Sequence, residues 1–133
     1  MSYRLLELPN ALITDLSFND NKCTLTFSDV LIIKVMDAAQ QRTSWKQSGC
    51  IVIKGNFDDS VRNLQMELPA KVQSGKFQDN IFVYDDTIRL PCHVYGDVGI
   101  DINFEKPMHP LEIKGEEMEV VLEGTPKYIA HID

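Results

Sequence analysis

Long hydrophobic runs, paired cysteines and an excess of positive charge are all missing from this 133-residue sequence. No uninterrupted apolar run exceeds four residues, far below the roughly 20 that a membrane-spanning helix needs. The three cysteines are widely spaced, so the sequence indicates neither a disulfide framework nor a zinc ribbon. The net charge of −7 argues against nucleic acid and anionic membranes as partners, because both attract lysine and arginine.

Signatures of catalysis are missing as well. The sequence contains no nucleophile elbow, no phosphate-binding P-loop and no histidine spacing typical of a metal site. Cys92 and His93 adjoin, but neighbours on an extended chain point to opposite faces, so they predict no catalytic dyad. Paired acids such as Asp58-Asp59 fit turns between strands. We therefore expect no catalytic residues, metal ligands or cofactors, and a protein that is not an enzyme.

The length of the chain predicts a single soluble domain over residues 1–133, large enough to bury its own core. Met1 leads into no signal-like apolar segment, so we expect a cytoplasmic protein. The three thiols are expected to be reduced, and Cys23 and Cys50 lie in apolar patterns that predict buried positions.

Alternating apolar and polar residues predict a mainly antiparallel all-β fold. Residues 12–18 and 23–27 alternate on either side of Asn19-Asp20-Asn21, whose turn chemistry predicts a β-hairpin. Further strands are expected at residues 30–35, 51–54, 64–68, 78–84, 87–90, 100–105, 111–114, 117–123 and 127–132. A total of about nine or ten short strands is typical of a β-sandwich or flattened barrel. The inward positions are leucine, isoleucine, phenylalanine, methionine and valine, which favours a filled interior.

One stretch departs from this pattern and predicts a short helix near 37–46. Asp37 followed by Gln40 fits a capping box, and Ser48-Gly49 fits the end of a helix. Trp45 would be the only large apolar residue of this helix. A helix so polar would bury the indole poorly, so Trp45 is a candidate contact residue for a partner.

The negative charge is confined to the second half of the chain. Residues 1–66 carry seven acids and seven bases, whereas residues 67–133 carry thirteen acids and six bases. Many of these acids lie on two of the predicted strands, 97–105 and 116–123. If these strands are neighbours, their outward acids would gather on one face and repel each other. The candidate binding residues are Asp97, Asp101, Glu105, Glu117, Glu119, Glu123 and Trp45.

Two resemblances to known families follow from these residues. Asp15-Leu16-Ser17 is similar to the aspartate-x-serine element of PilZ domains, but the glycine of that element is replaced by Asp20 and its arginine pair is missing. The acidic strands in a small cytosolic β-domain resemble the immunity proteins of bacterial toxin systems, including contact-dependent inhibition. That resemblance implies a protein that neutralises a cognate nuclease toxin by binding it. The expected partner is therefore a basic toxin domain; the alternative is a small β-barrel module that binds a ligand or is structural.

Overall fold

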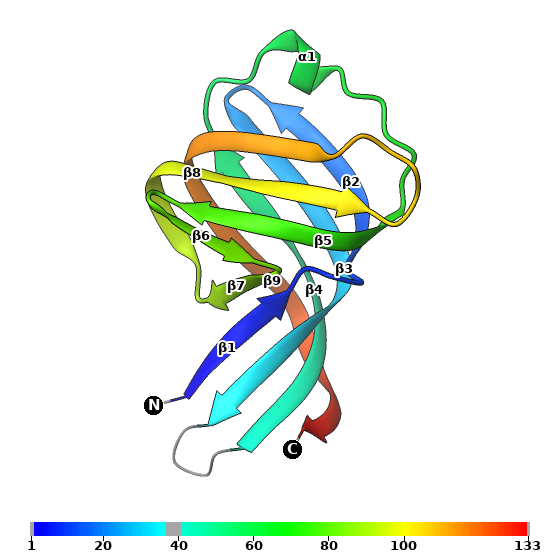
Figure 1. The fold of residues 1–133 in the computed structure, drawn as a ribbon, viewed down its shortest axis with the longest axis vertical. Coiled ribbons are helices and arrows are strands. Elements are labelled where there is room, and N and C mark those ends of the chain that lie inside the picture. The colour runs from blue at the N-terminus through cyan, green and yellow to red at the C-terminus, as the bar shows by residue number, and fades with distance from the viewer. Residues whose placement is uncertain (1, 37–40, 133) are drawn as a thin grey trace.

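The computed structural model describes residues 2–36 and 41–132, which form an all-β structure with antiparallel strand pairing and one tiny helix (Figure 1). Its elements are β1 (Ser2–Glu7), β2 (Leu12–Asn19), β3 (Lys22–Met36), β4 (Gln41–Lys54), α1 (Asp59–Arg62), β5 (Ala70–Asp79), β6 (Phe82–Asp85), β7 (Thr87–Leu90), β8 (His93–Phe104) and β9 (Leu111–Ile132). The predicted all-β class is confirmed. The hairpin predicted at residues 12–27 is also confirmed, because Asn19 pairs with Lys22 across a turn in which Asp20 has a φ of 56°.

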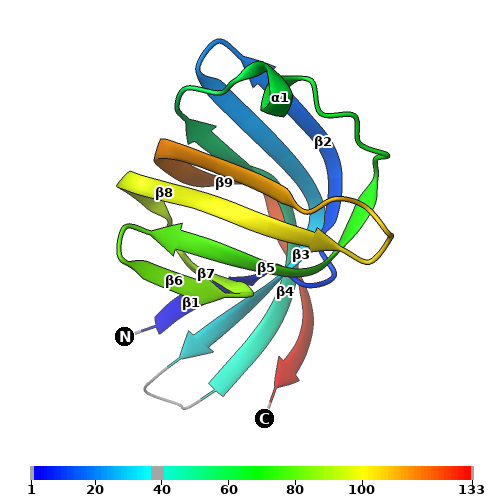
Figure 2. The same ribbon diagram turned by 45° about the horizontal axis from the view of Figure 1, so that its top comes forward.

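Six strands close into a barrel. The sheet order runs β2-β5-β8-β9-β4-β3, and an additional pairing of β2 with β3 joins the two ends (Figure 2). The weakest join in this ring is the seam between β2 and β5, which pairs only Leu12 with Lys71 and Ile13 with Ala70. Loop hydrogen bonds extend the seam, as Val72 N donates to Ala11 O over 2.9 Å.

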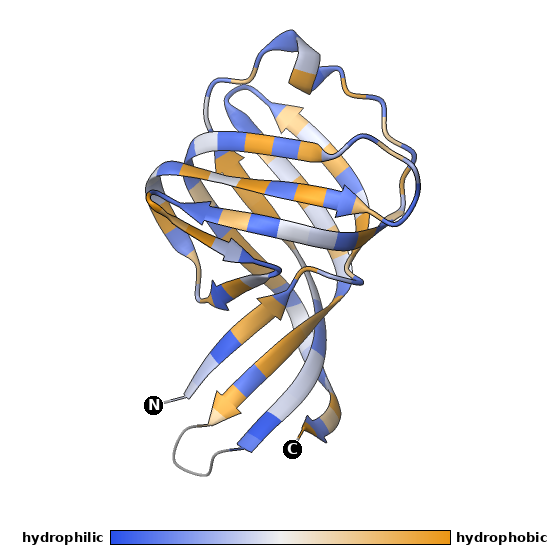
Figure 3. Ribbon diagram, viewed as in Figure 1, coloured by the Kyte–Doolittle hydropathy of each residue, from blue (hydrophilic) through white to orange (hydrophobic). Residues whose placement is uncertain are grey.

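The barrel interior is filled by large apolar side chains. Hydrophobic and hydrophilic positions alternate along its strands (Figure 3), as expected where one face of each strand is buried. The most deeply buried positions, with at most 2% of their surface exposed, include Leu25, Ile51, Ile100, Ile113 and Met118. They come from β3, β4, β8 and β9, so strands far apart in the sequence meet in one core. The predicted filled interior is confirmed.

Three long strands continue beyond the barrel. Together with β1 they form an extension that we call the stalk, defined as residues 2–7, 30–36, 41–47 and 124–132. Both chain ends lie beside it in Figure 1. β1 pairs with β3 on one side and with β7 on the other, while β4 pairs with both β3 and β9. A register shift between Phe27 and Val30 marks where β3 passes from barrel to stalk.

Three local predictions are wrong, and one of them is the strand expected at 78–84, which a turn at residues 80–81 divides between β5 and β6. The helix expected near 37–46 is not formed from Gln41 onward, because these residues belong to β4 and pair continuously with β3; residues 37–40 lie outside the described residues. Cross-strand pairing overrides a weak local helix signal. The strand expected at 64–68 is instead part of the connection from α1 to β5.

The helix that does form is a single turn. Asp58 caps α1, since its Oδ1 accepts a hydrogen bond from Val61 N over 3.1 Å, which satisfies one free donor of the first turn. These hydrogen bonds also lower the pKa of the Asp58 carboxyl, the one from Ser60 Oγ most. Within residues 2–36 and 41–132, no helix has the length and apolar content needed to cross a membrane.

Candidate functional site

The two acidic strands do lie side by side. β8 and β9 are antiparallel neighbours, but their register separates the acids into two groups. Asp101 lies opposite Glu112, whereas Glu117 and Glu119 lie opposite the first residues of β8. With a rise of about 3.3 Å per residue, five strand positions place Glu112 and Glu117 roughly 16 Å apart. The single acidic cluster expected from the sequence is therefore divided, because antiparallel strands bring the start of one beside the end of the other.

Two further predicted residues lie away from both groups. Glu105 follows the end of β8, and its Oε1 is 4.0 Å from Lys71 Nζ at the start of β5. Glu123 lies opposite Ser48 of β4, well along β9 toward the stalk. Glu123 shares the outer face of β9 with Glu117 and Glu119. Burial, followed by the charges of Glu123 and Glu119, raises the pKa of the Cys50 thiol. Glu105 is at the far end of β8.

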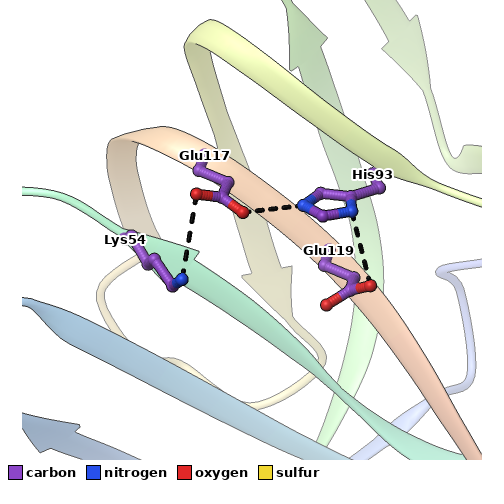
Figure 4. A network of polar contacts seen from close by, with 4 residues as sticks. All are labelled: Lys54, His93, Glu117 and Glu119. Carbon is purple, nitrogen blue, oxygen red and sulfur yellow. Dashed lines mark hydrogen bonds and ion pairs between the residues drawn. The ribbon is translucent and has the colours of Figure 1, made fainter.

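Glu117 and Glu119 belong to a polar network on the outer surface where β4, β8 and β9 meet (Figure 4). His93 Nε2 is 2.7 Å from Glu117 Oε2, and His93 Nδ1 is 3.5 Å from Glu119 Oε2. Lys54 Nζ lies 3.8 Å from the other oxygen of Glu117. The His93 hydrogen bond, followed by the nearby Lys54 charge, lowers the pKa of the Glu117 carboxyl. This network, Lys54, His93, Glu117 and Glu119, offsets part of the expected repulsion.

We predict that His93→Phe raises the pKa of Glu117 toward its ordinary value, because the ring would still stack on Tyr95 but donate no hydrogen bond. The lowered pKa means that this network stabilises the fold above the ordinary carboxyl pKa and is lost as pH falls through the folded-state pKa. A carboxyl carbon NMR titration measures the shift. Lys54→Met is the matched control and should raise the pKa less, since an exposed charge is screened. An unchanged pKa in His93→Phe would contradict this interpretation.

An exposed apolar surface adjoins the network and was not predicted. The turn after β5 and strand β6 expose Ile81 by 88%, Phe82 and Val83 by 58% each, and Tyr84 by 44%; Tyr95 of β8 is exposed by 62%. We call these five residues the hairpin face; Phe82 and Tyr84 stack on the Phe77 side of β6, and Val83 points to the other side. Tyr95 joins it to the network, because Tyr95 stacks on the His93 ring with centroids 4.8 Å apart and is paired with Glu117 in the β8–β9 register.

Asn80 holds the hairpin face together. Its backbone N–H donates to Asp97 O over 2.8 Å and its side-chain Nδ2 donates to Tyr95 O over 2.9 Å. Its Oδ1 in turn accepts a hydrogen bond from Asp97 N over 3.0 Å. Three hydrogen bonds from one residue therefore fix the β5–β6 turn against the irregular segment of β8. The sequence signal for this surface is the unbroken apolar run 81–84 directly after an asparagine.

Gly96 leaves room for the Asn80 side chain, and we predict that Gly96→Ala disrupts the hydrogen bonds between Asn80 and β8. Its φ is +112°, and an added Cβ would lie 2.2 Å from Asn80 Oδ1. We expect the free energy of unfolding to fall by about 2–3 kcal/mol, from backbone strain and overpacking together. Hydrogen exchange should show faster exchange at the Asn80 and Asp97 amides. Gly124→Ala is the control: its φ is +75° but nothing lies within 4 Å of the added Cβ. Equal effects of the two substitutions would contradict the role of Asn80.

Trp45 is not part of this surface. It lies on β4, where it is half-buried, with its ring edge-to-face on Tyr128 at a centroid distance of 5.2 Å. Its Nε1 donates to Thr43 Oγ1 over 2.9 Å. Seven strand positions separate it from Val52, the partner of Glu119, which is roughly 23 Å at about 3.3 Å per residue. Trp45 as a contact residue for a partner stays a prediction, but its place on the stalk separates it from the network of Glu117 and Glu119.

Cys23 is 1% exposed and lies in the core, as predicted. Cys50 was also expected to be buried but is only half-buried. Burial raises the pKa of Cys23 to about 12. Burial, with the nearby charges of Asp79 and Glu119, raises the pKa of Cys92 to about 11. Cys92 faces the interior while the His93 ring lies on the outer surface, so the two neighbours do point to opposite faces.

No protein-family model, no curated protein and no solved structure matches this chain. Function is therefore inferred from the chemistry of the surface itself. Among residues 2–36 and 41–132, no group of three or more histidine, cysteine or acidic side chains is arranged to hold a metal ion. The hairpin face instead offers aromatic rings, aliphatic side chains and nearby carboxylates, a combination suited to contact with another protein.

Proposed function

We propose that this chain binds a basic protein through the hairpin face and the carboxylates around it. The observation that carries the proposal is a group of five large apolar side chains on both sides of β6 and on the adjoining end of β8, each exposed by 44% or more. Large apolar side chains exposed close together on a folded protein mark interaction sites, and aromatic residues dominate the energetics of such sites.

The negative charge around the hairpin face favours a basic protein as the partner. Between Phe77 and Asp97 the chain carries four acids and one base, Arg89, while Lys76 and Lys114 lie beside Val83 on one side of β6. Asp79 is paired with Phe82 in the β5–β6 ladder, and Asp97 lies directly after Tyr95 and Gly96, so carboxylates border the apolar surface. A basic protein would be attracted to this border and would pair with it on contact.

The particular role we propose is inhibition of a nuclease-type toxin by an immunity protein acting in the cytoplasm, without catalysis. A nuclease holds phosphates in a basic active site, and a surface that presents carboxylates around an aromatic anchor can occupy such a site. The likeness in charge and size to immunity proteins supports this role. The divided acidic groups do not oppose it, because carboxylates near the hairpin face would contact the partner, among them those of Asp79, Asp85, Asp97, Glu117 and Glu119.

The test is a charge reversal at the border of the hairpin face. Asp85→Lys with Glu119→Lys should reduce the rate of association with a basic partner protein, sought among the products of neighbouring genes, and should flatten its dependence on salt. Association steered by charge falls steeply with ionic strength, while dissociation changes less. Stopped-flow binding at several salt concentrations measures both rates.

The matched control is Asp15→Lys with Glu67→Lys, which changes the net charge equally on exposed residues of β2 and of the α1–β5 connection. It should leave the association rate close to that of the unsubstituted protein. Equal effects of the two variants would show that only the total charge matters and would remove the proposed binding face.

A further inference from the structure

A second feature of the molecule lies on the stalk, away from the hairpin face. A cavity of about 460 Å³ opens between β1, β3, β4 and the β7–β8 connection. Its apolar lining includes Ile32 and Leu90, which are 3% and 4% exposed, together with Pro91 and Trp45. Its polar lining includes Arg4 and Lys34. The volume is in the range of pockets that hold small organic molecules, which are typically apolar with a few placed polar groups.

The two cations of this cavity are placed in an unfavourable arrangement. Arg4 and Lys34 are direct partners in the antiparallel β1–β3 ladder, and both are half-buried. Like charges directly opposite each other destabilise a sheet. Among the described residues, no acidic side chain forms an ion pair with either cation. Glu7, the other charged residue of β1, is three positions from Arg4 and so points to the opposite face. The arrangement leaves both charges available to an anion.

The cavity also contains an aromatic ring, the indole of Trp45, beside the two cations. Trp45 is the β4 partner of Ile32, and its ring is fixed by the hydrogen bond to Thr43 and the edge-to-face contact with Tyr128. A fixed indole presents a flat surface on which another ring can stack. The cationic pair and the indole line the same cavity, so one small molecule can contact both.

We propose that this cavity binds a small phosphate ester of a flat ring. The phosphate would lie between Arg4 and Lys34, because a guanidinium fork and an ammonium together match a dianion, and the ring would lie against Trp45. A long polyanion fits the surroundings poorly, since the chain as a whole carries a net charge of −7. This site is separate from the hairpin face and does not depend on the protein-binding proposal.

Trp45 is the only tryptophan of the chain, so its fluorescence reports on this cavity alone. Phenyl phosphate should change the emission saturably, and should bind at least about tenfold more tightly than inorganic phosphate or phenol, because only the ester contacts both halves of the site. Arg4→Met and Lys34→Met should each weaken binding about tenfold or more, since they keep the aliphatic stem and remove the charge. Relief of the like-charge pair means that both variants should fold, which circular dichroism can verify.

Lys46→Met is the matched control. It removes a cation from the position next to Trp45, but Lys46 is exposed and points to the other face of β4. Phenyl phosphate affinity should be unchanged in this variant. The proposal is overturned if phenyl phosphate gives no saturable change, if inorganic phosphate binds as tightly, or if Lys46→Met weakens binding as much as Lys34→Met. Lys34→Met should bind the basic protein normally, which keeps this result distinct from a failure of the hairpin-face proposal.

Discussion

Replacing Phe82 and Tyr95 of the hairpin face with serine should weaken binding to the basic partner by about a thousandfold. Aromatic anchors at the centre of an interface each contribute about 2 kcal/mol or more, and about 4 kcal/mol corresponds to a factor of about 1,000 in the dissociation constant. Both side chains are more than half exposed in the chain alone, so their loss should change its free energy of unfolding little. Titration calorimetry of the complex measures the affinity, and urea unfolding of the free chain measures the stability.

The control is Tyr128→Ser, which removes an aromatic ring of similar exposure, 55%, from the stalk. Its partner affinity should be that of the unsubstituted protein. A normal affinity in the Phe82→Ser, Tyr95→Ser variant, with both proteins folded, would place the binding surface elsewhere.

The second large effect is expected at the seam of the barrel, where Ile13→Ala should lower the free energy of unfolding by about 2–5 kcal/mol. Ile13 is 2% exposed and is one of only two β2 residues that pair with β5. Its loss leaves a cavity in the core at the point where the fewest ladder pairs hold the ring closed. Urea unfolding monitors the stability, and hydrogen exchange should locate faster opening at the amides of residues 11–13 and 70–72.

Ile129→Ala is a suitable comparison, because Ile129 is 44% exposed and its truncation should change stability by no more than about 0.5 kcal/mol. If Ile13→Ala destabilises the protein but exchange at the seam rises no more than elsewhere, the barrel opens as one unit and the seam is not a weak point.

The strands that were predicted correctly are those in which apolar and polar residues alternate with a period of two. The hairpin at 12–27 and the neighbouring acidic strands carry alternating residues that leave one face to bury, and such strands form wherever that face finds a core. The stretch 41–46 has no such alternation, and its conformation is set by pairing with β3 instead. Alternation alone also misled at 64–68, where no neighbouring strand supplies a partner.

The candidate site was harder to predict than the fold. Exposure of the run 81–84 cannot be read from its composition, because four apolar residues in a row also describe a buried strand. The carboxylate network depends on the β8–β9 register, which brings His93 beside Glu119 and is fixed by the whole sheet. The importance of Asn80 and Gly96 arises from a contact across the turn, so it becomes visible only when both segments are placed.

The three hydrogen bonds that join Asn80 to β8 also have a thermodynamic consequence. They order the β5–β6 turn and the segment around Tyr95 when the chain folds. The entropic cost of immobilising that backbone is therefore part of the free energy of folding and not of binding. A partner that docks onto the hairpin face then loses less conformational freedom in the complex, and more of the gross contact energy is retained as affinity. Calorimetry should accordingly show a heat-capacity change that matches the buried apolar area alone, without the larger change that accompanies folding on binding.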